Sequence, residues 1–157
     1  MSSADSWLRR VGSTRLAVAM VLTGAITAFA PQAGAATSCG GQLPDWLDAA
    51  YTGTYVVYGY GDTPMPLSIR FVGNDVTVES SSRDLDAIHT SFLGKGSVSG
   101  VLQGALQWTV GTRKPESLYP SKCDSAGKVI AAKWNGSNFG GPVSLMAGGD
   151  VTRSGSK

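Results

Sequence analysis

The sequence predicts a single all-β domain, an antiparallel meander of seven or eight strands. Several segments alternate apolar and polar residues with the period of a strand, and the gaps between them are short and rich in Gly, Asn and Asp. Parallel strands would need crossovers of about a dozen residues or more, so neighbouring strands should be antiparallel. Because closure removes exposed strand edges, we expect a small closed barrel, with a β-sandwich as the alternative.

Residues 1–35 are predicted to be a secretory signal peptide. Three arginines, the last of them Arg15, precede residues 16–35, which carry no charge and end in the small residues Ala33-Gly34-Ala35. A basic start, an apolar middle and a small-residue end are typical of cleavable export signals. We expect Sec-type export, cleavage after Ala35 and a secreted domain without membrane attachment. An uncleaved anchor is the alternative.

The export signal also accounts for the basic balance of the chain. The chain has 13 Lys and Arg against 11 Asp and Glu, and residues 1–35 hold three of the former and one of the latter. The rest therefore carries ten charges of each sign, scattered among one another, and no net charge. Nucleic-acid-binding domains carry clustered Lys and Arg, so we expect no nucleic-acid partner.

The exported part contains two cysteines, Cys39 and Cys123. An even number of cysteines in an exported chain predicts a disulfide bond. There is no C-x-x-C motif, and one histidine with two distant cysteines makes a poor zinc site. We therefore expect a structural disulfide, no bound metal and no cofactor.

The domain is expected to span residues 36–152, followed by a frayed tail at 153–157. A short helical turn is expected over residues 44–51, because proline and acidic residues are favoured in the first turn of a helix. A second helical turn is expected over residues 83–88. Strands are expected over residues 51–60, 67–71, 76–78, 106–110, 130–134 and 143–145, each with one buried face apart from the first, which has tyrosines on both faces. Turns are expected at residues 61–64, 73–75 and 135–138, which hold Gly, Asn and Asp.

Four aromatic residues are candidates for a ligand site at one end of the barrel: Tyr55, Tyr58, Trp108 and Trp134. The two tryptophans share the inward-facing positions of their strands, so they either fill the core or line a cavity. Tyrosine combines apolar area with a hydroxyl group and suits ligand contact. Packing alone is the alternative for all four residues.

His89 is the single histidine, and Asp84 and Asp86 precede it by five and three residues. A short helix would place Asp86 and His89 on one face, as in a carboxylate-oriented base. The chain has no Gly-x-Ser-x-Gly motif and no further nearby ligand for a metal. A solvated histidine in a polar loop is the alternative, and we expect no catalysis.

These patterns favour a secreted β-domain that binds a small apolar or sugar-like ligand, or the surface of a protein partner. A small extracellular hydrolase, using His89 with Asp86 or with a distant serine, is one alternative function. A structural or inhibitory extracellular protein that acts through its loops is the other.

Overall fold

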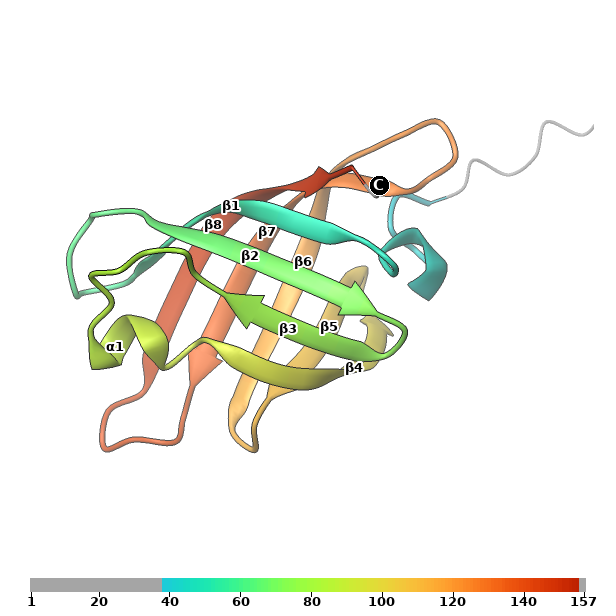
Figure 1. The fold of residues 1–157 in the computed structure, drawn as a ribbon. Coiled ribbons are helices and arrows are strands. Elements are labelled where there is room, and N and C mark those ends of the chain that lie inside the picture. Colours follow the sequence, from blue (N-terminus) through green and yellow to red (C-terminus); the bar gives the residue numbers. More distant parts are fainter. Residues whose placement is uncertain (1–37, 156–157) are drawn as a thin grey trace, which may run out of the picture. The chain divides into compact units, whose positions relative to one another are not determined.

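The computed structural model describes residues 38–155, which form a closed barrel of eight antiparallel strands (Figure 1). Each strand pairs with the next along the chain, and β8 pairs with β1 to close the sheet. The expected signal peptide, residues 1–35, lies outside the described residues. The elements are η1 (Leu43–Asp45), β1 (Ala50–Val57), β2 (Met65–Val72), β3 (Asp75–Glu79), α1 (Ala87–Thr90), β4 (Gly94–Leu102), β5 (Ala105–Val110), β6 (Lys114–Cys123), β7 (Val129–Asn138) and β8 (Leu145–Ser154).

The predicted closed barrel is confirmed, and the alternation correctly predicted the inward residues of β2, β3 and β5. The inward side chains of β2, β3 and β5 are all buried: Leu67, Ile69, Phe71, Val76, Val78, Leu106, Trp108 and Val110. The turn expected at residues 73–75 is also present, since Val72 pairs with Asp75 and Gly73 has a φ of 56°. A two-residue hairpin loop needs such positive φ values, which glycine adopts readily.

The turn expected at residues 135–138 is wrong, because these residues continue β7. Asn135 pairs with Ser117 of β6 and with Gly148 of β8. Gly136 faces inward, where a Cβ would lie 2.6 Å from Cζ2 of Trp134. The glycine therefore makes space for an indole ring and does not mark a turn. The chain reverses after Asn138 instead.

Three strands also differ from the expectation, two in their bounds and one in which residue faces inward. Tyr58 and Tyr60 lie beyond the end of β1, and Val143 is 56% exposed in the loop before β8. Ile130 is only half-buried because the pairing of β6 with β7 is irregular beside it, and Val129 takes the buried position. A bulge of this kind shifts which residues face inward.

Both helical turns are present but short. η1 ends at Asp45, and Asp48 has a φ of 51°, which an α-helix through residues 44–51 would not allow. α1 begins only after Asp86, which caps its first turn. Figure 1 shows η1 and α1 near opposite ends of the barrel.

Two further features tie the ends of the described segment to the barrel. The expected disulfide between Cys39 and Cys123 is confirmed, with Cα atoms 5.6 Å apart. Arg153 and Ser154, which were expected in the frayed tail, are the last residues of β8. The Arg153 guanidinium donates to the carbonyl oxygens of Asp45 and Leu47, at 3.3 and 3.4 Å. The barrel domain therefore extends two residues further than the expected end at residue 152, and β8 is much longer than the strand expected over residues 143–145.

Candidate functional site

The four aromatic candidates separate into three buried residues and one exposed residue. Tyr55, Trp108 and Trp134 are at most 1% exposed, whereas Tyr58 is 56% exposed. Tyr55 and Trp134 meet edge to face, with ring centroids 5.5 Å apart. The structure therefore places three of the four side chains in the packed interior, and only Tyr58 on the surface.

Glu116 joins the two tryptophans inside the barrel. The indole N–H groups of Trp108 and Trp134 both donate to Oε2 of Glu116, each at 3.0 Å. β6 lies between β5 and β7, and Glu116 pairs with Trp108 on one side and with Gly136 on the other. The space above Gly136 is occupied by the Trp134 ring. The register and one glycine thus bring both indoles to a single oxygen.

The surroundings of Glu116 favour its protonated form. The residue is 1% exposed, and its second oxygen, Oε1, has no hydrogen-bond partner among the described residues. Burial raises the pKa of Glu116 to about 8, although the two indole hydrogen bonds oppose the shift. At neutral pH the carboxyl group is therefore mostly uncharged.

Two rows of rings fill the barrel on either side of Glu116. The first row is Trp46, Tyr51, Phe71 and Trp108, and the second is His89, Tyr55, Trp134 and Phe92. Neighbouring rings have centroids 5.4–6.4 Å apart, mostly edge to face. Burial raises the pKa values of Tyr51 and Tyr55 to about 12. These rings act as core, which was the alternative interpretation of the candidate site.

His89 and Asp86 meet as their spacing predicted. Asp86 Oδ1 accepts the backbone N–H of His89 at 2.8 Å and lies 2.7 Å from its ring Nδ1. These two hydrogen bonds, the backbone one foremost, lower the pKa of Asp86. Within residues 38–155, no hydroxyl or thiol group is hydrogen-bonded to the imidazole. No group of three His, Cys, Asp or Glu residues in this range could hold a metal ion, so Asp84 does not form a metal site with Asp86 and His89. The geometry orients a base without placing a nucleophile beside it.

A groove of about 310 Å³ lies on the outer wall of the barrel, across β1, β8 and β7. Thr54, Asp150 and Lys133 are in register across these three strands and are all exposed. They offer a hydroxyl, a carboxylate and an ammonium group within one row. The groove therefore presents hydrogen-bond donors and acceptors side by side.

Tyr58 forms the apolar part of the same groove. The next row across the three strands is Val56, Gly148 and Asn135. A Cβ on Gly148 would overlap the Tyr58 hydroxyl and lie 3.3 Å from Asn135 Oδ1. The missing side chain lets the end of the Tyr58 ring lie over β8. An exposed aromatic ring and an amide group thus border the polar row.

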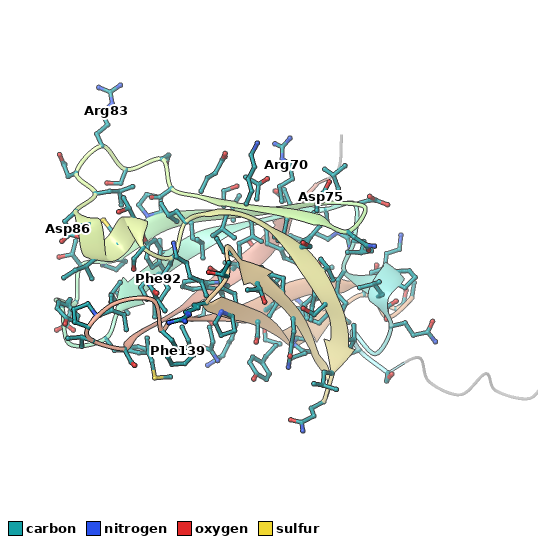
Figure 2. The ribbon with its side chains drawn as sticks, turned by 90° about the horizontal axis from the view of Figure 1, so that it is seen from below. Arg70, Asp75, Arg83, Asp86, Phe92 and Phe139 are labelled. Carbon is teal, nitrogen blue, oxygen red and sulfur yellow. A yellow bond between two sulfur atoms is a disulfide. The ribbon has the colours of Figure 1, made fainter. Side chains whose placement is uncertain are left out.

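Larger hollows elsewhere on the described surface lack this combination. One, of about 530 Å³, is lined by residues such as Asp48, Arg70 and Val72, and another, of about 470 Å³, by residues such as Glu79 and Lys95. Figure 2 shows Arg70 projecting from the outer wall. Neither hollow is lined by an exposed aromatic ring. The groove beside Tyr58 is therefore the stronger candidate for a ligand site.

Exposed apolar side chains also gather near Tyr58. Five large hydrophobic residues are exposed on the segments around the β1–β2 and β7–β8 loops: Tyr58, Tyr60, Phe139, Val143 and Met146. Residues 58–65 and 138–146 contain a single charged residue, Asp62. In Figure 2, Phe139 and Asp86 lie toward the same end of the barrel. The groove therefore opens beside two loops that are apolar and nearly uncharged.

Comparisons with known proteins leave the function to be argued from this geometry. No family model matches the chain, and no curated protein and no solved structure matches it significantly. Between residues 38 and 155, no helix is long and apolar enough to cross a membrane. Sequence reasoning had singled out Tyr58 but neither Glu116 nor the polar residues of the groove.

Proposed function

We propose that this chain is an exported, non-enzymatic binding domain that holds a sugar-like ligand in the groove beside Tyr58. The observation that carries the proposal is an exposed tyrosine ring next to a row of hydroxyl, carboxylate and ammonium groups on a closed barrel. A sugar ring has an apolar C–H face and a rim of hydroxyl groups. The face would pack on Tyr58 while Lys133, Asn135 and Asp150 exchange hydrogen bonds with the rim.

The charges of the groove favour an uncharged ligand. Asp150 and Lys133 stand side by side in register, so their charges offset one another. The domain that would remain after signal cleavage has no net charge and exerts no long-range attraction on an ion. Affinity for a neutral glycan should therefore change little between low and high salt, because screening acts on charged partners.

The proposed export accords with the disulfide of the domain. A bond between Cys39 and Cys123 persists in oxidising compartments and is rare in the cytosol. Intact mass spectrometry of the protein from its producing cells should give a chain that begins at or near Ala36. Its mass should rise by one pair of hydrogens on reduction. A retained signal or free thiols would contradict the export proposal.

The binding proposal is tested with a panel of neutral and charged oligosaccharides measured by isothermal titration calorimetry. We expect a neutral glycan to bind the wild-type domain, and Tyr58→Ala to weaken its binding at least about tenfold. Leu102→Ala is the matched control, because Leu102 is 59% exposed on β4 and lies outside the groove. It should leave the affinity unchanged.

A further variant separates the groove from the neighbouring loops. Phe139 is 51% exposed in the β7–β8 loop and does not line the groove. If Phe139→Ala abolishes binding while Tyr58→Ala does not, the loops bind the ligand and the groove proposal is wrong. Absence of binding across the whole panel would contradict it as well.

A further inference from the structure

We infer that the carboxyl group of Glu116 is a proton-operated latch in the barrel interior: as a neutral acid it holds Trp108 and Trp134 together, and its ionisation loosens them. The inference is independent of the proposed sugar binding. It rests on the arrangement of two indole groups around one carboxyl group that is sealed from solvent.

The hydrogen bonds of Glu116 are unequally distributed between its two oxygens. Oε2 accepts both indole N–H groups at 3.0 Å, while Oε1 is buried and has no partner among the described residues. A neutral acid can carry its proton on Oε1 and keep both bonds to Oε2. A carboxylate would leave a charged oxygen without a donor, and a buried charge of this kind is strongly unfavourable.

Few charged groups are available to compensate a carboxylate at this position. On its own strand, the charge of Lys114 acts weakly on the carboxyl group, and no ion pair within residues 38–155 includes Glu116. β5 and β7 present indole rings to it. From β1, the Tyr55 hydroxyl donates to the carbonyl oxygen of His89, and the His89 ring is turned to Asp86. No neighbouring element therefore supplies a cation in contact with the carboxyl group.

Ionisation should act on both aromatic rows at once. When Glu116 releases its proton to solvent, the carboxylate must gain water or lose burial, and either change separates β5, β6 and β7 locally. Trp108 ends one row of rings and Trp134 is inside the other, so both lose their fixed surroundings. Lys133 and Asn135 flank Trp134 on β7, so the outer groove lies next to the loosened segment.

The test uses the two glutamates of the chain, Glu79 and Glu116, as a matched pair. Near-ultraviolet circular dichroism and acrylamide quenching of tryptophan are measured from about pH 5 to 10, a range that brackets the ionisation of a buried carboxyl group. Wild type and Glu79→Gln should lose the near-ultraviolet signal and become severalfold more quenchable in a one-proton transition. Glu116→Gln, which keeps the shape but cannot ionise, should show no transition. His89→Gln should keep it.

A second measurement needs no variant and covers the case in which Glu116→Gln fails to fold. Carbon-13 NMR of wild-type protein labelled at the glutamate carboxyl carbons should show a carboxyl group that stays protonated at neutral pH. The latch is disproved if both groups ionise below about pH 6, the range of ordinary glutamates. It is equally disproved if folded Glu116→Gln retains the transition.

Discussion

The two faces of β7 show how one strand serves a sealed interior and an open surface. On the inner face, Trp134 is fully buried and bonded to Glu116. On the outer face, Lys133 and Asn135 are exposed and border the groove. Each face depends on a glycine that gives space to an aromatic ring. Gly136 accommodates Trp134 inside, and Gly148 of the neighbouring strand accommodates Tyr58 outside.

The difference between the faces separates stability from binding. The inner rings have no solvent contact, so changes there should alter the free energy of unfolding. The outer groups are exposed, so changes there should alter ligand affinity while leaving the fold intact. Four predictions test this division, from the largest expected effect to the smallest.

Trp134→Ala should lower the free energy of unfolding by about 3–5 kcal/mol, because it removes a fully buried ring and two edge-to-face contacts. Its neighbour Lys133 is exposed, and Lys133→Ala should change the free energy by no more than about 0.5 kcal/mol. Urea unfolding followed by far-ultraviolet circular dichroism measures both. Comparable losses for the two variants would contradict the division between the faces.

The stability of the domain should fall as pH rises from about 4.5 to 8, because of Glu116. Its pKa is raised to about 8 in the folded state, so the folded protein keeps a proton that the unfolded chain has released. The stabilisation is complete below the unfolded pKa and is lost as pH rises through the folded pKa, by an amount on the order of 4 kcal/mol.

The urea concentration at the unfolding midpoint should fall with rising pH across this interval in wild type and in Glu79→Gln. In Glu116→Gln it should change much less with pH. The lowered pKa of Asp86 acts in the opposite sense and at lower pH. Its contribution is present above the unfolded value and is lost as pH falls, so it does not account for a decline above pH 4.5. A rise in stability over the interval would contradict the assignment.

Gly136→Ala should destabilise the domain by about 1–3 kcal/mol, through overpacking. A Cβ at this position would lie 2.6 and 2.8 Å from two ring carbons of Trp134 and 3.0 Å from Phe92. Both rings are completely buried, so they would have to repack against the rest of the interior. Thermal unfolding of wild type and variant at one pH measures the effect. An unchanged midpoint would show that the interior is looser than its contacts indicate.

The sequence was sufficient to predict the barrel where strands alternate clearly, as in β2, β3 and β5. It gave no sign of β4, where Gly94 and Gly96 take positions that apolar side chains usually fill. β6 was hidden because Glu116 faces inward and Pro115 and Pro120 interrupt the pattern. Glu116 lies two residues before Leu118 and therefore on the same face of β6. This spacing could have predicted that Glu116 faces inward, but only once β6 is recognised as a strand.

The sites depended on information that local patterns do not contain. Both indole groups reach one oxygen of Glu116 because of the register of three strands. Spacing along the sequence does not determine this register. The groove requires closure of β1 against β8, whose paired residues lie about a hundred positions apart. Tyr58 was predicted as a candidate for ligand contact at one end of the barrel because its residue type suits such contact, but its position on the outer wall was not predicted. Its neighbours Asn135 and Asp150 become visible only in the closed barrel.

Gly148→Ala should give the smallest change in stability and a clear loss of ligand affinity. The added methyl group would overlap the hydroxyl end of the Tyr58 side chain, which is exposed and can move away, so the free energy of unfolding should change by less than about 1 kcal/mol. Moving the ring takes the apolar surface away from Asn135 and from the row of Asp150 and Lys133. Calorimetric titration with a glycan that binds wild type should show at least about tenfold weaker binding.

The double variant Gly148→Ala/Tyr58→Ala makes this last prediction sharper. If the methyl group acts by displacing the ring, it should weaken binding no further once the ring is removed, so the two effects should not add. Additive losses would mean that Gly148 itself contacts the ligand. Full affinity in Gly148→Ala would show that ligand binding does not depend on the position of the Tyr58 ring over β8. The proposal that the ligand binds between this ring and the outer face of β7 would then be contradicted.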